Sequence, residues 1–185
     1  MKGSAMSAQL VEPYAVALMA LAKDTNKVDD FADYSRSFLS AFNASEEFSS
    51  FVMNPLLGAE EKKDVLKSIC GNEVDTYFLN FLFLLVDRRR IVFLEAIFER
   101  FITLQRELKN IVLAKVTCAT SISRSQEDAI ADKVKSLTGA SNVELEITTD
   151  ASLLGGVVIK VGSQVFDASL KGQIRRISMG LLGSN

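Results

Sequence analysis

Few side chains in this chain could carry out catalysis. Its 185 residues include no histidine, which removes the commonest general base, the nucleophile–histidine arrangements and most catalytic zinc and copper sites. Carboxylates remain, but acidic pairs such as Asp29–Asp30 and Glu60–Glu61 have no second type of catalytic residue at a useful spacing, and we interpret them as surface. Cys70 and Cys118 lie too far apart for a disulfide framework or a short zinc-binding motif. The sequence therefore predicts no catalytic residues, no metal site and no cofactor.

The pair Gly155–Gly156 is the only candidate for a glycine-rich phosphate loop. Such a loop exposes backbone amides at the start of a helix, whereas this pair is followed by Val157, Val158 and Ile159, which are typical of a strand. Neither a Walker pattern nor a G-x-G-x-x-G pattern occurs. We expect a bend or a close backbone contact at this point, and no nucleotide site.

Basic residues are too few and too scattered to indicate a nucleic-acid-binding protein. The net charge is −2 and the pI is about 5.3, so no global basic field exists. The run Arg88–Arg90 follows a predicted helix, where it could meet phosphate or an acidic partner, or form a solvated helix end. The last predicted helix carries Lys171, Arg175 and Arg176, which could form either a basic contact face or a solvated face. An RNA-associated protein that uses this last helix is kept as an alternative.

The composition changes near Asn110 and predicts two domains. Eleven of the twelve phenylalanines precede this residue, and seven of the ten glycines follow it. We therefore expect a helical domain over residues 1–110 and a mixed domain over residues 111–185. The densest apolar run, from Tyr77 to Val86, has ten residues, about half of what a membrane span needs.

Hydrophobic periodicity sets the expected fold class as α+β. A repeat of 3.6 residues predicts an antiparallel bundle of about six helices, over residues 11–22, 28–43, 46–52, 60–69, 74–86 and 91–109. Ser45 is a candidate cap for the third of these helices. The second domain is a small α/β domain with one sheet, whose strands are expected at 111–120, 143–148, 157–161 and 164–166. One helix is expected to begin at the capping box formed by Ser123 and Gln126 and to end at Gly139. A last helix is expected over residues 169–182.

The first and fifth predicted helices are apolar on every side. Residues 14–22 and 78–86 contain almost no polar side chain. Such a helix is either fully enclosed or presents a second face to a partner. A bundle of this size has little room to enclose two of them, which favours a groove for an amphipathic partner helix.

A known pattern appears in the second domain, between Val143 and Gly162. The segment VELEITTDASLLGGVVIKVG resembles the signature of the delta subunit of F-type ATP synthases, the family of the mitochondrial oligomycin-sensitivity-conferring protein. The signature residues that match include Asp150, Gly155, Gly156, Lys160 and Gly162. The stretch from Pro13 to Leu18 resembles the family's first helix, and the long start before Pro13 resembles cyanobacterial or plastid-type members.

The resemblance implies a non-catalytic stator subunit in the peripheral stalk. The helical domain would grip the N-terminal helix of an alpha subunit of the catalytic head, in a groove between its first and fifth helices. The second domain would hold the C-terminal ends of the b-type stalk subunits. The chain would then lie peripherally on the cytoplasmic or stromal face of an energy-transducing membrane, such as the thylakoid, and meet that membrane only through the complex.

Helical spacing selects the residues expected to line the groove. They are Tyr14, Leu18 and Leu21 on the first helix, and Phe81, Leu84 and Arg88 on the fifth. The other possibility is that these apolar side chains belong to the core. The alternative function is a free-standing helical adaptor that binds an amphipathic helix and has no connection with ATP synthesis.

Overall fold

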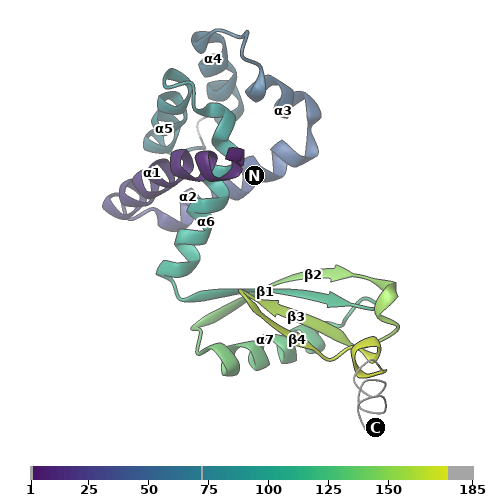
Figure 1. Ribbon diagram of the computed structural model, residues 1–185. Helices are drawn as coiled ribbons and strands as arrows, with labels where there is room; N and C mark the ends of the chain where they lie inside the picture. Colours follow the sequence, from purple (N-terminus) through teal and green to yellow (C-terminus); the bar gives the residue numbers. More distant parts are fainter. Residues whose placement is uncertain (1, 72, 175–185) are drawn as a thin grey trace. The chain divides into compact units, whose positions relative to one another are not determined.

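The computed structural model describes residues 2–71 and 73–174, which form two compact units, unit 1 up to Gln105 and unit 2 from Arg106 onward. The predicted boundary at residue 110 lies a few residues beyond this division. The helices of unit 1 are α1 (Lys2–Asp24), α2 (Val28–Ala44), α3 (Glu46–Met53), α4 (Ala59–Cys70), α5 (Thr76–Asp87), the short 3₁₀ helix η1 (Ile91–Phe93) and α6 (Leu94–Leu108). Figure 1 shows these elements in chain order.

Side-chain caps determine where two of these helices begin. Ser45 Oγ accepts a hydrogen bond from the amide of Phe48 at 3.1 Å, so the expected cap of α3 is confirmed. The Asp75 carboxylate accepts from the amide of Tyr77 at 2.7 Å, which places the start of α5 at Thr76, two residues later than predicted. Each cap satisfies an amide that would otherwise have no partner in the first turn.

Phenylalanine side chains from three helices form the centre of unit 1. Phe31 and Phe38 of α2, Phe78 of α5 and Phe98 of α6 are all buried. The ring centroids of Phe31 and Phe78 are 5.3 Å apart, those of Phe38 and Phe98 are 5.8 Å apart, and those of Phe78 and Phe98 are 5.5 Å apart. These spacings are typical of packed aromatic pairs. The phenylalanine-rich first half of the sequence is therefore the source of this core.

Unit 2 is a four-stranded sheet with one helix packed on it. Its elements are β1 (Ile111–Cys118), α7 (Arg124–Thr138), β2 (Asn142–Thr149), the short 3₁₀ helix η2 (Ala151–Leu153), β3 (Val157–Val161) and β4 (Gln164–Asp167). The strand order is β2-β1-β3-β4, with β1 and β2 parallel and the other two pairings antiparallel. Helical structure begins again at Leu170 and continues to Ile174. The rest of the predicted last helix, with Arg175 and Arg176, lies outside the described residues.

Local signals predicted several features of unit 2 correctly. The amide of Ser123 donates to Gln126 Oε1 at 2.8 Å, as expected for the capping box of α7. Gly139 ends α7 in the left-handed conformation, with φ of 69°. Gly162 has φ of 57° in the two-residue turn that joins β3 and β4. The expected α+β class, with helices first and a single sheet afterwards, is confirmed.

The sheet of unit 2 has one apolar face and one polar face. Ala114 and Val116 of β1 are buried with Val134 of α7, so α7 packs on their side. Side chains alternate along a strand, which places Lys115 on the opposite face. There Lys115 Nζ lies 3.1 Å from a carboxylate oxygen of Glu146 on β2, and β-sheet register puts Lys160 of β3 beside it.

Candidate partner-binding surface

Helices α1 and α5 pack against each other within unit 1. Figure 1 shows them as neighbours, α1 in purple and α5 in teal. Their inner sides join the aromatic core through buried residues such as Ala15 and Leu18 of α1 and Phe78 and Leu82 of α5. Any partner surface on these helices must therefore use the residues that remain outside.

Two of the six residues expected to line a groove belong to the core instead. Leu18 is fully buried and Phe81 is only 5% exposed, so the expectation that they lie at the surface is wrong. A helix that is apolar all round gives no sign of which side meets its neighbours, and packing against the surrounding helices decides it. Tyr14 and Leu21 are half-buried against the same core.

The other two expected residues are accessible. Leu84 of α5 is 43% exposed, and Arg88, which caps the C-terminal end of α5, is exposed as well. The amide of Arg88 donates to the carbonyl of Leu84 at 3.0 Å, so the backbone at the helix end is ordered by its own hydrogen bonds.

The structure adds surface residues that sequence reasoning missed. On α5, Tyr77 is 55% exposed and Asn80 is exposed, which gives a stripe Tyr77–Asn80–Leu84 at helical spacing. On α1, Val16 is 48% exposed, and the small residues Ala17 and Ala20 are exposed beside it. The sequence marks these positions only indirectly, because they lie between the positions of each helix that face the core.

Ion pairs attach the middle of α1 and the end of α5 to other helices of the unit. Arg100 of α6 holds the Glu12 carboxylate with two hydrogen bonds, of 2.7 and 3.0 Å, and these hydrogen bonds lower the pKa of Glu12. Lys63 Nζ of α4 lies 2.7 Å from Asp87 at the end of α5, and hydrogen bonding to Asp87 raises the pKa of Lys63.

At the start of α5, Lys27 pairs with the capping residue Asp75. The hydrogen bond between the two side chains lowers the pKa of Asp75 and raises that of Lys27. Both helices that carry the exposed residues are thus attached to the rest of unit 1 by charged side chains, and their outer stripes stay available.

Four of the five signature residues of unit 2 have a role in its local structure. Gly156 passes so close to the backbone of Ala168 and Ser169 that a side chain has no room there, and Gly155 lies against the side chain of Leu170. The predicted close backbone contact is therefore confirmed. Asp150 accepts a hydrogen bond from the amide of Ser152 at 2.9 Å, which lowers the pKa of Asp150 and begins η2. Gly162 forms the β3–β4 turn, and Lys160 is an exposed residue of β3.

The described residues show no arrangement suited to metal chemistry or to crossing a bilayer. Residues 2–71 and 73–174 contain no group of three or more potential ligands that could hold a metal ion. Within the same ranges, no helix combines the length and the apolar character that a membrane span requires. The remaining surface is one of helices, a sheet face and ordered turns.

Comparison with known proteins decides the family. The family described as ATP synthase delta (OSCP) subunit matches residues 10–181. This chain belongs to that family. It is 68% identical to the ATP synthase subunit delta of a Picosynechococcus strain, over the full length of both chains. It is 50% identical to the subunit of the same name from a Synechocystis strain, with 98% of each chain covered.

The chain is accordingly a non-catalytic structural subunit of the peripheral stalk, the stator of an F-type ATP synthase. The resemblance in the signature segment is confirmed, and so is the cyanobacterial type. A free-standing adaptor and an RNA-associated protein are no longer needed as explanations. A chain in the mitochondrial ATP synthase hexamer of Toxoplasma gondii has the same fold, with a TM-score of 0.75 at 24% identity over 94% of this chain and 97% of that one.

Proposed function

We propose that unit 1 binds the N-terminal helix of an alpha subunit of the catalytic head across α1 and α5, and that unit 2 holds the C-terminal ends of b-type stalk subunits. The chain would join the head to the stalk and keep the head from turning with the rotor. It would lie peripherally on the cytoplasmic or stromal face of an energy-transducing membrane such as the thylakoid.

The exposed apolar stripes on two packed helices carry the first half of this proposal. Tyr77 and Leu84 of α5 and Val16 of α1 are large apolar side chains left outside the core. Small residues on α1, Ala17 and Ala20, would let a second helix approach closely. An amphipathic helix buries its apolar side in such a surface with anchors three or four residues apart.

A polar residue and a charge would orient the bound helix. Asn80 lies between Tyr77 and Leu84 in the α5 stripe, and Arg88 follows one turn after Leu84. A carboxylate on the partner helix would pair with Arg88 at this end of the stripe. Rim charges of this kind contribute more to orientation and association rate than to affinity.

The polar face of the sheet supports the second half. α7 packs on the opposite face, and Lys115 is already paired with Glu146. Lys160 is exposed on β3, with Val165 of β4 beside it in register and 58% exposed. This combination of an apolar side chain and a cation would suit a stalk helix with an acidic end.

Binding of a synthetic alpha-subunit N-terminal peptide to the full chain tests the first half by calorimetry. Leu84→Ala and Tyr77→Ala should each lower the affinity about thirtyfold, since truncating a hot-spot residue costs roughly 2 kcal/mol. Leu56→Ala is the matched control, because Leu56 is the most exposed large apolar residue of the described chain and lies outside α1 and α5. Unchanged affinity in both α5 variants would refute the α1–α5 site.

The second half is tested with a peptide from the C-terminal end of the b-type subunit. Lys160→Glu should weaken binding about fivefold. Lys133→Glu, a charge reversal at an exposed position of α7, should leave the affinity unchanged. Equal losses in both variants would show that general electrostatics, and not the sheet face, governs the interaction.

A further inference from the structure

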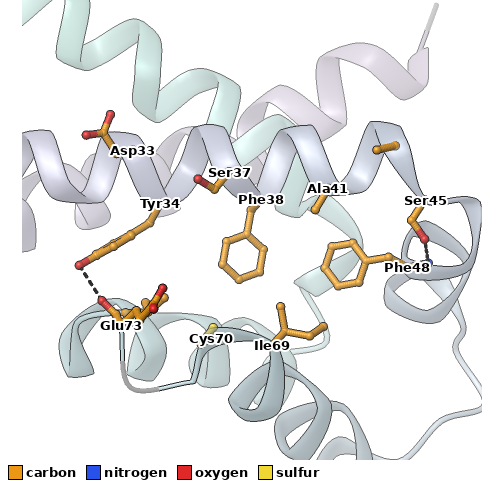
Figure 2. A pocket seen from close by; sticks show the side chains of 12 residues that line it. Asp33, Tyr34, Ser37, Phe38, Ala41, Ser45, Phe48, Ile69, Cys70 and Glu73 are labelled. Atoms are coloured by element: carbon orange, nitrogen blue, oxygen red, sulfur yellow. Dashed lines mark hydrogen bonds between the residues drawn. The ribbon is translucent and has the colours of Figure 1, made fainter.

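A second apolar groove lies in unit 1, away from α1 and α5. It has a volume of about 670 Å³ and lies between α2, α3, the end of α4 and the turn that follows α4. Figure 2 shows Phe38 and Phe48 with Ile69 facing them across the groove. Phe38 belongs to the core, but Ile69 is 52% exposed although it lies in an apolar surrounding. The family assignment and the proposed α1–α5 site leave this groove unexplained.

Helix α2 forms one long wall of the groove with small side chains. Ser37, Ala41 and Ala44 line it at spacings of four and three residues, which places them on one side of the helix. From Asp33 to Ser45 this wall is about 18 Å long, at 1.5 Å per residue. A wall of that length, in which Tyr34 and Phe38 stand among small residues, accommodates about three turns of a second helix.

Acidic residues lie at both ends of the groove. Glu73 lines one end, where its backbone carbonyl accepts a hydrogen bond from Tyr34 Oη at 3.2 Å. At the other end, Ala44 and Ser45 are shared with a depression that is also lined by Glu46 and Glu47. Among the described residues no lysine or arginine lines the groove, and none forms an ion pair with these three glutamates. Asp33 differs in having a partner, because the guanidinium of Arg36 lies 2.9 Å from its carboxylate and neutralises its charge.

We infer that this groove docks a cationic amphipathic helix from another chain of the assembly. Its apolar residues, at i, i+4 and i+7, contact Phe38, Phe48 and Ile69, and lysine or arginine side chains at its two ends pair with Glu73 and with Glu46 and Glu47. Like charges would be repelled at both ends, so an acidic helix is excluded. No residue of α1 or α5 lines the groove, so the two helices would bind to unit 1 at separate places.

Photo-crosslinking within the assembled ATP synthase tests the inference. Benzoylphenylalanine replaces Ser37, which lines the groove, or Ser40, an exposed serine on the same helix that does not line it. We expect at least a tenfold higher yield from position 37, on a segment that mass spectrometry shows to be basic and amphipathic. An adduct with an acidic segment, with a second copy of this chain or with a small molecule would overturn the inference, and so would the absence of any adduct.

Charge reversal in the same assembly separates recognition from proximity. Glu73→Lys, and the pair Glu46→Lys with Glu47→Lys, should each lower the crosslink yield about fivefold. Glu99→Lys, at an exposed position of α6, is the control and should leave the yield unchanged. If the crosslink yield stays the same after the reversals at Glu73, Glu46 and Glu47, the acidic ends have no role in recognition. If the Ser37 replacement lowers the melting temperature, the exposed residue Ala44 offers a second labelling position on the same wall.

This result is independent of the α1–α5 proposal. Leu84→Ala should weaken binding of the alpha-subunit peptide and leave the crosslink at position 37 unchanged. Loss of both signals in that variant would mean that one helix spans both places and that the second site does not exist.

Discussion

Gly156 lies against Ala168 so closely that a Cβ atom at Gly156 would be 2.4 Å from the carbonyl oxygen of Ala168. Gly155 lies against the side chain of Leu170, and the amide of Leu170 donates to the carbonyl of Gly155 at 3.0 Å. The glycine pair therefore holds the start of β3 against the segment that follows β4. The most recognisable motif of the sequence therefore contains a packing contact.

Gly156→Ala should destabilise unit 2 by about 3 kcal/mol or more, because φ is 79° and the added atom meets backbone that cannot move aside. Gly162→Ala is the matched control. Its φ is also positive, at 57°, but nothing lies within 4 Å of the added atom, so the expected cost is about 1 kcal/mol. Urea unfolding gives both values, and hydrogen exchange in β1 and β3 localises them. Equal costs would show that the close contact contributes nothing.

Arg89→Gly should stabilise unit 1 by about 0.5–1 kcal/mol. Arg89 follows α5 with φ of 55°, and its amide and that of Arg90 donate to the carbonyls of Val86 and Leu85. This is the double hydrogen-bond pattern in which glycine is usual at the left-handed position. Arg90→Gly provides the comparison, since Arg90 has φ of −107° and gains nothing from glycine. Thermal unfolding measures both, and a loss of stability in the Arg89 variant would contradict the prediction.

Phe81→Ala and Leu84→Ala should differ sharply in stability although they lie three residues apart on α5. Removing the buried ring of Phe81 should cost about 3–5 kcal/mol, whereas truncating the partly exposed Leu84 should cost less than about 1 kcal/mol. Chemical denaturation of the two variants measures this difference. Similar costs would place Leu84 in the core and remove it from the proposed partner surface.

The contribution of the Lys27–Asp75 pair should depend on pH only at the extremes. The folded state lowers the pKa of Asp75 from 3.8, so its stabilisation is complete above that value and is lost as pH falls through the lower, folded-state pKa. The pKa of Lys27 is raised from 10.5, so its contribution is complete below 10.5 and is lost as pH rises through the higher one.

Asp75→Asn isolates this charge and keeps a capping side chain. The melting temperature of the variant should lie below that of the wild type by a constant amount at moderate pH. The two curves should begin to approach each other as pH falls below about 4 or rises above about 10.5, and should meet only beyond the shifted pKa values of Asp75 and Lys27. A difference that persists in strong acid would mean that the carboxylate charge is not what stabilises the start of α5.

Sequence reasoning located most elements because apolar periodicity and capping residues are local signals. Ser45, Ser123 and Gly139 mark the boundaries where they were expected. The first helix is the exception: α1 begins at Lys2, whereas the prediction began at residue 11. The added turns have no apolar repeat to reveal them. Pro13, near the start of the predicted helix, therefore lies well inside α1.

The binding surface was harder to predict than the fold. In α1 and α5 the burial of Leu18 and Phe81 and the exposure of Val16 and Tyr77 depend on where neighbouring helices lie, which periodicity in an all-apolar helix does not record. The groove along α2 was also invisible. Its walls come from α2, α3 and the end of α4. The turns between those helices bring the acidic residues of both ends to the same groove.

The ion pairs of unit 1 have a further consequence for this stator subunit, which concerns how its charges respond to pH. Glu12 and Asp75 have pKa values lowered from an already acidic range, and Lys27 and Lys63 have values raised from an already basic one. Every one of these groups is therefore moved further from neutrality, and the sequence has no histidine to titrate there. A change of about one pH unit from neutrality, in either direction, therefore leaves the charges of the contacts that anchor α1 and α5 unchanged.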